Sequence, residues 1–237
     1  MDAAIVCGLL MSLLICVLLV DDLRTNLRLL RRVRQSRALV ADTRPDDGPA
    51  KIGGAASGST LSAPLSGRPC VLWHVEVDES RSVLTQGRRK LLYRQTSGEH
   101  ITVSSGALLA HVHVTDHKLF LSDDLRASQS RFTPLSAALR TRLHQLGVPT
   151  EGALRLGRQL HVVERLIAPG EQVFVQGEVE QIGGVPHLLG SPTAPLILTD
   201  QSEQQLLERL RRGVVVLAGT VVALLLFALL LALLLIS

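Results

Sequence analysis

Two uncharged apolar segments, one near each end of the chain, constrain the fold more than any other feature. They cover residues 3–20 and 213–236 of the 237-residue sequence. Each is about long enough to cross the hydrocarbon core of a bilayer as a helix. Neither shows the polar stripe of a long helix that packs on a soluble core. The sequence therefore predicts two transmembrane helices.

The first segment is expected to remain in the protein as an anchor. Only Met1 and Asp2 precede it, and they lack the basic residues that open a secretory signal peptide. No small-residue cleavage site stands before Asp21 and Asp22. We therefore interpret residues 3–20 as an uncleaved membrane anchor.

Arginine residues gather on the inner flank of each apolar segment, and the outer flanks contain no Lys or Arg. Positively charged flanks are retained in the cytoplasm. The sequence therefore predicts a protein of the cell (inner) membrane, with a cytoplasmic middle region and both termini outside. Anionic lipid headgroups are the nearest partners for such side chains. The residues expected at the headgroups are Arg24, Arg28, Arg31, Arg32, Arg211 and Arg212.

The chain between the two apolar segments divides into four parts. Apolar residues at helical spacing, with arginines between them, predict a basic juxtamembrane helix over residues 21–40. Residues 41–59 are rich in Gly, Ala, Pro and Asp and predict a flexible linker. Residues 60–200 predict a folded domain. Residues 201–212 predict a second juxtamembrane helix that continues into the second span.

Alternating strands dominate the folded part. Val71, Trp73, Val75 and Val77 recur at every second position, as in a half-buried strand. Further strands are expected at residues 90–96, 100–104, 109–115, 159–166, 172–181, 186–189 and 196–199. We predict a mainly β (α+β) domain, a small barrel or a sandwich-like sheet. The residues expected in its core are Trp73, Val75, Val103, Val112, Leu160, Val173, Val175 and Val179.

One helix is expected within this domain. Thr133 is a good N-cap and Pro134 fits the first helical position, while Gly147 suits the residue after the last turn. The sequence therefore predicts a helix between Thr133 and Gly147.

Three blocks of the domain follow one another in an order that resembles a known family. The first is PLSGRPCVLWHVEVDE, residues 64–79, with a Ser-Gly-x-Pro-Cys turn before an aromatic-containing strand that ends in Glu. The second is LLYRQTSGEHITVSSGALL, residues 91–109, and the third is ERLIAPGEQVFVQGEVEQIGG, residues 164–184. Together they resemble the GIDE, or BAM ("beside a membrane"), domain family. The matching residues are Ser66, Gly67, Pro69, Cys70, Trp73, Glu79, Gly98, Gly106, Glu164, Gly170 and Gly177.

The best-known members of that family are mitochondrial membrane-anchored E3 ubiquitin ligases, in which a RING finger follows the second span. A RING needs two zinc sites built from about eight Cys and His ligands in CxxC-type pairs. This sequence contains three cysteines and no CxxC. We therefore expect a RING-less relative for which ligase activity is supported by family name only. The Arg-rich, Lys-poor composition is typical of a bacterial one.

Three histidines offer the best candidate for metal chemistry. His111 and His113 lie two residues apart on one face of a predicted strand, and His117 follows a turn. Imidazole nitrogens at this spacing can bind zinc. The alternative is three partly exposed histidines on a sheet surface. A metal-dependent enzyme at these residues is therefore the alternative function, and no other cofactor is expected.

Cys70 and His74 are a weaker candidate pair, for thiol catalysis. Positions four apart on a strand share a face but are separated by about 13 Å, too far for a hydrogen bond between nucleophile and base. We expect Cys70 to be a small buried apolar side chain. The other cysteines, Cys7 and Cys16, lie in the first span, so no disulfide is expected in the domain.

The sequence leads to the expectation of a membrane-anchored, non-enzymatic interaction module. Its protein partner is not specified by the residues, and no nucleic acid is expected because few aromatic side chains are offered for base stacking. Small residues four apart in the second span, such as Gly219 and Ala223, are compatible with weak homo-oligomers. The bacterial relatives suggest a stress or defence signalling pathway.

Overall fold

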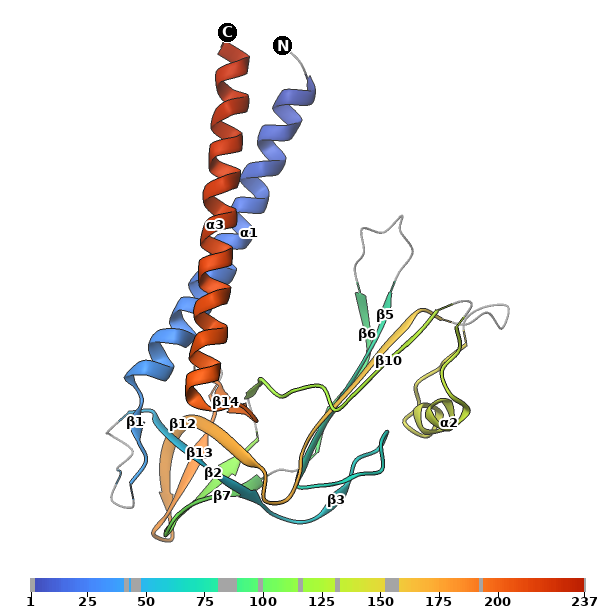
Figure 1. Cartoon of the computed structure of the whole chain (residues 1–237), viewed down its shortest axis with the longest axis vertical. Helices are drawn as coiled ribbons and strands as arrows, with labels where there is room; N and C mark the ends of the chain where they lie inside the picture. The colour runs from blue at the N-terminus through green and yellow to red at the C-terminus, as the bar shows by residue number, and fades with distance from the viewer. Residues whose placement is uncertain are drawn as a thin grey trace. The chain divides into compact units, whose positions relative to one another are not determined.

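The computed structural model describes residues 3–40, 43, 48–80, 89–97, 100–114, 117–130, 133–151, 158–191 and 194–236. Its described part falls into two compact units. We call them the helix unit, made of Met1–Ser36 and Ser202–Ser237, and the β unit, made of Arg37–Gln201. Figure 1 shows the chain coloured from one end to the other.

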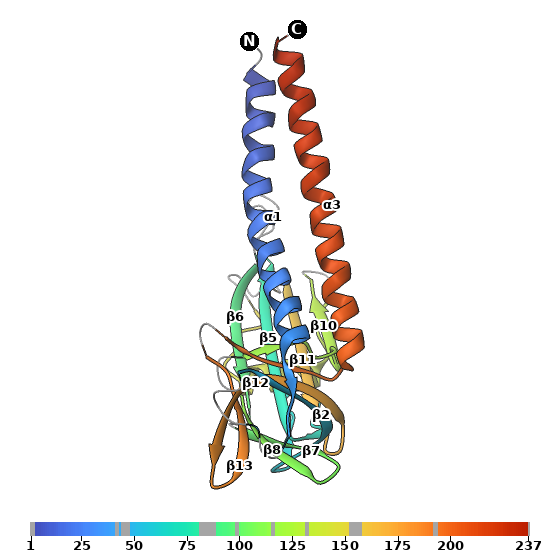
Figure 2. The same ribbon diagram turned by 90° about the vertical axis from the view of Figure 1, so that its left-hand side faces the viewer.

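Two long helices form the helix unit. Helix α1 covers Ala3–Gln35 and helix α3 covers Glu203–Ile236. They pack against each other in opposite directions, so both chain ends lie at the same end of the pair (Figures 1 and 2). Helix α1 takes in most of the predicted first juxtamembrane segment together with its apolar segment, and helix α3 does the same at the other end of the chain. Helix α1 ends at Gln35, before the predicted boundary at residue 40.

Helix α3 is the one helix among the described residues that is long and apolar enough to cross a membrane, over Glu203–Leu230. Most of that stretch is not covered by other parts of the protein. The first apolar segment, residues 3–20, is not identified as a helix of this kind, so the structure does not support the predicted two-span topology. Several side chains of residues 3–20 lie outside the described part, namely those of residues 3–7, 9, 10 and 13.

Five strands of the β unit close into a barrel. They are β2 (Ala50–Ser57), β7 (His100–Ser105), β8 (Leu108–His113), β12 (Gln172–Ile182) and β13 (Val185–Leu189). The ring runs β2–β7–β8–β13–β12 and returns to β2. Strands β8 and β13 pair in parallel, and the other neighbours pair antiparallel. This is the Greek-key order of an OB-type barrel.

The prediction of a mainly β domain built as a small barrel is confirmed. The predicted core residues are also buried, apart from Trp73, which is half-buried. Members of the barrel core are Ile52, Ile101, Val103, Val112, Val173, Val175, Val179, Leu188, Leu196 and Leu198.

Short strands extend the barrel sheet. Strand β1 (Arg37–Ala38) pairs with β2, strand β14 (Leu196–Thr199) pairs with β12, and strand β9 (His117–Leu119) pairs with β14. The chain leaves the β unit directly after β14.

The first barrel strand corrects the prediction of a flexible linker over residues 41–59. Strand β2 occupies Ala50–Ser57 of that segment and alternates buried and exposed positions. Its small residues are needed for close packing rather than for flexibility. A Cβ added to Gly54 would lie 2.1 Å from the backbone oxygen of Ser104 on β7. The folded domain therefore begins before the predicted boundary at residue 60.

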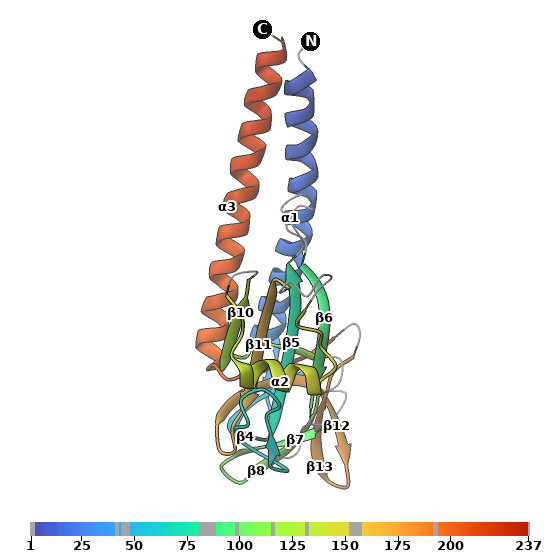
Figure 3. The same ribbon diagram turned by 90° about the vertical axis from the view of Figure 1, so that its right-hand side faces the viewer.

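A second sheet is built from the two long insertions between barrel strands. It has the order β10 (Leu125–Gln129), β11 (Leu160–Ile167), β5 (Leu72–Ser80) and β6 (Arg89–Thr96), all antiparallel. Helix α2 (Ala137–Gln145) lies in front of this sheet in Figure 3. Buried side chains from the sheet and the helix form one apolar cluster, which includes Val75, Val77, Leu139, Leu143 and Leu160.

The start of α2 corrects the predicted N-cap. Ser136, not Thr133, caps the helix, and its Oγ accepts a hydrogen bond from the backbone N–H of Leu139 at 3.3 Å. The predicted end is confirmed, because Gly147 follows the helix with a φ of 74°, a conformation that glycine adopts without strain. Both Thr133 and Ser136 are good capping residue types, so the sequence alone did not separate them.

Candidate functional site

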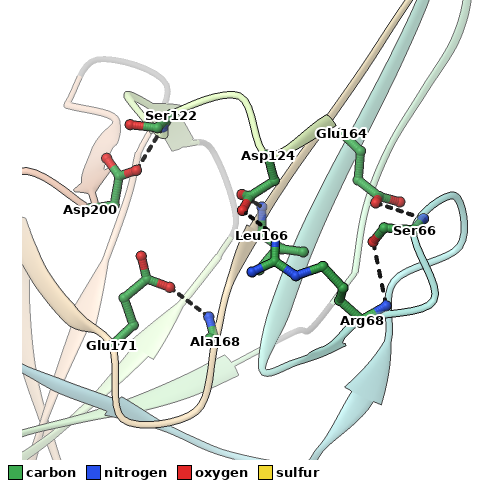
Figure 4. A network of polar contacts seen from close by, with 9 residues as sticks. All are labelled: Ser66, Arg68, Ser122, Asp124, Glu164, Leu166, Ala168, Glu171 and Asp200. Carbon is green, nitrogen blue, oxygen red and sulfur yellow. Dashed lines mark hydrogen bonds and ion pairs between the residues drawn. The ribbon is translucent and has the colours of Figure 1, made fainter. Parts of the chain in front are cut away.

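A buried carboxylate holds the turn at residues 64–67, which includes the first two residues of the Ser-Gly-x-Pro-Cys block. Glu164 on β11 is fully buried. Its Oε1 accepts a hydrogen bond from the backbone N–H of Leu65 at 2.6 Å, and its Oε2 accepts one from that of Ser66 at 2.9 Å. Figure 4 shows the carboxylate directed at this turn. Gly67 follows with a φ of 75°, which favours glycine at that position.

Asp124 forms a second polar anchor beside the first. Its Oδ1 pairs with Nη1 of Arg68 at 2.9 Å, and its Oδ2 accepts a hydrogen bond from the backbone N–H of Leu166 at 3.0 Å (Figure 4). The backbone N–H of Asp124 also donates to the carbonyl oxygen of Glu164 at 3.0 Å. The two carboxylates therefore join the turn, strand β11 and the segment before β10.

Helix α2 contacts the same turn. The guanidinium of Arg142 donates a hydrogen bond to the carbonyl oxygen of Leu65. Leu65 thus has both backbone polar groups satisfied by side chains from distant segments. We call Leu65, Ser66, Asp124, Arg142 and Glu164 the turn anchor.

Cys70 lies in strand β4 (Pro69–Cys70) and is fully buried. Burial, and then the negative charges of Glu164 and Asp124, raise the pKa of its thiol above the usual value. Its thiol donates weakly to the carbonyl oxygen of Leu61 at 3.7 Å. The predicted role of a small buried side chain is confirmed, since a thiol with a raised pKa is a poor nucleophile.

His74 has partners other than Cys70. Its Nδ1 lies 2.8 Å from Oγ1 of Thr96, and its Nε2 lies 3.8 Å from Oε2 of Glu76. The carboxylate of Glu76 also contacts Arg94 at 2.8 Å and Arg165 at 3.7 Å. These groups form a charged surface cluster on the second sheet.

The other residues of the resemblance lie in turns and strands. Gly106 and Gly170 have positive φ angles of 61° and 81° and sit in turns. A Cβ on Gly177 would lie 2.7 Å from the carbonyl oxygen of Leu189. Trp73 and Glu79 belong to β5, whereas Gly98 lies outside the described residues. Among the described residues of this set, the glycines therefore meet backbone requirements of turns and of close strand packing.

Four of the chain's eight histidines gather on the outside of the barrel. We call this set, His100, His111, His113 and His187, the histidine face. His187 on β13 is the register partner of His111 on β8. His100 on β7 is the register partner of His113 on β8. The register of the β7–β8 and β8–β13 pairs thus brings together side chains that are up to 87 positions apart in the sequence.

The rings of the histidine face are in contact. Nε2 of His113 lies 2.8 Å from Nδ1 of His187, and their ring centroids are 5.1 Å apart. The centroid of His111 is 5.0 Å from that of His187, and its Nδ1 lies 3.1 Å from Oγ1 of Thr102. Desolvation, and then the charges of His111 and His113, lower the pKa of His187 below its usual value, with Glu180 acting in the opposite direction.

His117 does not share a strand with the other two predicted ligands. It begins β9, which pairs with β14, whereas β8 pairs with β7 and β13. Its side chain lies outside the described part, so a metal site that includes it stays a prediction. Within the described residues, no group of three or more His, Cys, Asp or Glu side chains is placed to hold a metal ion. His187 was missed because nothing in its local sequence marks it.

The predicted headgroup arginines lie on the two long helices. Arg24, Arg28 and Arg31 are exposed on α1, and Arg32 is half-buried. Arg211 and Arg212 are exposed on α3, where Arg212 pairs with Glu208 at 3.1 Å. Contact of these six side chains with lipid headgroups stays a prediction.

Comparison with known proteins gives one family. The family model GIDE, described as E3 ubiquitin ligase, matches residues 74–233, about two thirds of the chain. The Ser-Gly-x-Pro-Cys turn lies just before the matched range. No curated protein and no solved structure matches the chain.

Proposed function

Because the chain belongs to the GIDE family, we propose that it is a membrane-anchored, non-enzymatic interaction module. In this proposal α1 and α3 both cross the cell membrane, and the β unit is presented at its inner face. The barrel binds a protein partner there. From the family resemblance, we propose that the module acts in a stress or defence signalling pathway.

The observation that carries the proposal is the short connection between the barrel sheet and α3. Strand β14 ends at Thr199 and α3 begins at Glu203, which leaves residues 200–202 as the only link. Two hydrogen bonds hold the end of the β unit in place up to Gln201: Oδ2 of Asp200 accepts from the backbone N–H of Ser122 at 2.7 Å, and Oγ1 of Thr199 accepts from that of Gln201 at 3.0 Å. A β unit that only a few residues separate from a spanning helix stays close to the bilayer.

The packing of the helix unit supports a second span. Because α1 and α3 run in opposite directions, the uncharged residues 3–20 lie beside the uncharged residues 213–236. The arginine-bearing parts of both helices then lie at the same end of the pair. That end is the cytoplasmic one by the distribution of positive charge.

The partners of the motif residues support an interaction role. The carboxylates of Glu164 and Asp124 are occupied with backbone N–H groups and Arg68. The Cys70 thiol is buried. These side chains shape a turn, and this structural role is compatible with a domain that acts by recognition.

The outer face of β7 and β8 is the proposed recognition surface. In OB-type barrels the second and third strands carry the ligand-binding face, and β7 and β8 are those strands here. Leu109 on β8 is an exposed apolar side chain on this face.

Cysteine labelling in intact cells tests the topology. Ser59 is exposed in the β unit, and a Ser59→Cys substitution in a chain whose own cysteines are replaced by serine provides one reactive thiol. We expect a membrane-impermeant maleimide to label it only after the cells are permeabilised. Labelling in intact cells would place the β unit outside and contradict the proposal.

Site-specific photocrosslinking tests the recognition surface. A photoreactive residue is placed at Leu109 on β8, and at two exposed controls outside this face, Ile182 on β12 and Leu91 on the second sheet. We expect a discrete crosslinked product from Leu109 and none from either control. Equal products from all three positions, or no product from Leu109, would reject this surface.

A further inference from the structure

The histidine face holds two imidazole nitrogens that point at each other. Nε2 of His113 and Nδ1 of His187 are 2.8 Å apart, so they share one proton and cannot both be protonated at that contact. Zinc binds imidazole nitrogen at about 2.0–2.1 Å, and two such ligands at a tetrahedral ion are about 3.3 Å apart. A small turn of the two rings would therefore let a metal ion take the place of the shared proton.

His111 is oriented to supply a third nitrogen. Its Nδ1 lies 3.1 Å from Oγ1 of Thr102, which leaves Nε2 as the nitrogen available to a ligand. Metal-binding histidines commonly have their second nitrogen held in this way by a neighbouring polar group. The ring of His111 lies beside that of His187, with centroids 5.0 Å apart.

The backbone supports this arrangement without distortion. His111 and His113 are two positions apart on β8 and project from the same face, and His187 is the register partner of His111 on the adjacent strand. All three side chains are half-buried. Glu180 is the register partner of His187 on β12 and adds negative charge on the far side of His187.

We propose that His111, His113 and His187 bind one divalent transition-metal ion of the zinc class. Imidazole ligands suit zinc, copper and nickel better than calcium or magnesium. His100 is exposed, and its ring centroid is 6.2 Å from that of His113. It flanks the site and is not a required ligand. As the rings stand, no group of three or more His, Cys, Asp or Glu side chains among the described residues is placed to hold a metal ion, so the site requires the rings to turn on binding.

Zinc titration of the full chain tests the proposal. The protein is purified in detergent without a polyhistidine tag, and zinc chloride binding is measured by calorimetry, with cobalt(II) absorption as a second readout of coordination. We expect one ion per chain. His113→Ala and His187→Ala should each weaken binding by more than about 100-fold, and Thr102→Val by about 10–100-fold.

Matched variants decide the ligand set. His161→Ala, on β11 of the second sheet, and His117→Ala should leave zinc affinity unchanged, while circular dichroism shows that every variant keeps its fold. Zinc binding that persists in the His111, His113 and His187 triple variant would overturn the proposal. So would an absence of binding by the parent chain, or a loss of binding caused by His117→Ala but not by His187→Ala.

Discussion

Glu164 on β11 binds the backbone N–H of Leu65, which lies 99 positions earlier in the chain, at 2.6 Å. The contact connects the second sheet to the turn that precedes β4 and β5. A buried carboxylate that accepts two backbone N–H groups is well solvated by the protein, whereas the same donors without it would be left unpaired. The most recognisable carboxylate of the family resemblance is therefore a structural group.

The first prediction concerns that carboxylate. Glu164→Ala should lower the free energy of unfolding by about 2–4 kcal/mol, because two backbone donors lose their acceptor. Urea unfolding of the full chain in detergent, followed by the fluorescence of Trp73, the single tryptophan, measures the change. Glu171→Ala is the control, since it removes one local bond to the N–H of Ala168 and should cost about 1 kcal/mol. Equal costs for the two variants would contradict the role of the turn anchor.

The second prediction compares adjacent glycines of β2. Gly54→Ala should destabilise the barrel by about 3 kcal/mol or more, because its Cβ would lie 2.1 Å from the backbone oxygen of Ser104. Gly53→Ala should have little effect, because the nearest atom to its Cβ is the carbonyl oxygen of Val173 at 3.9 Å. Thermal unfolding of both variants measures the difference. Similar melting temperatures would mean that β2 does not close the barrel.

The third prediction concerns acid. Burial alone would raise the pKa of Glu76, but its hydrogen bond to Arg94 and the charges of Arg94, His74 and Arg165 lower it below the usual 4.5. A group with a lowered folded-state pKa stabilises the protein above its unfolded pKa, and this contribution is lost as the pH falls through the folded-state value. Glu76 should therefore stabilise the β unit at neutral pH and lose that effect below the usual value.

The pH dependence of a Glu76→Gln variant checks this sign. The parent chain should be more stable than the variant at about pH 7, and the difference should shrink as the pH falls to about 3. Glu208→Gln removes a carboxylate from an exposed pair with Arg212 on α3 and should show a much smaller difference. If the stability difference between the parent chain and Glu76→Gln grew as the pH fell, the pKa of Glu76 would be raised in the folded protein and not lowered.

The fourth prediction concerns thiol reactivity. In a Cys7→Ser and Cys16→Ser background, Cys70 should react slowly with iodoacetamide at neutral pH, because burial and two nearby carboxylates raise the pKa of its thiol. Unfolding in urea should restore an ordinary rate. The exposed thiol of Ser59→Cys provides the reference for a free cysteine. Rapid alkylation of folded Cys70 would mean that the thiol is accessible and activated.

Local pattern was sufficient for much of the fold. Alternation through Val75 and Val77 located β5, and Gly147 located the end of α2, because both signals arise within a few residues. Strand β2 was missed because a segment rich in glycine and alanine is typical of a linker. Its packing against the backbone of β7 cannot be inferred from the segment itself. Gly54 is small because of Ser104, some fifty positions later, and no local pattern contains that information.

The candidate site likewise contains residues that local sequence could identify and residues that only the tertiary fold brings together. His111 and His113 could be paired from their spacing on one strand. His187 joins them through the register of the parallel β8–β13 pair, which depends on closure of the barrel. Asp124 and Arg142 were also missed, because their partners are backbone groups of a distant strand and of a distant turn. Such contacts follow from the tertiary fold and leave no short-range signature.

Strand β2, the first strand of the barrel, and strand β14, the last strand before α3, both pair with β12. Strands β2 and β14 both contact residues Phe174 to Gln176, so they occupy its opposite edges. Both run antiparallel to β12, with Ala50 at the start of β2 and Thr199 at the end of β14. A pull applied at Ala50 and at Thr199 would therefore act on β2 and β14 in opposite directions and would load their hydrogen bonds to β12 in shear, all together rather than one after another. Strand β12 would carry this load between the two strands.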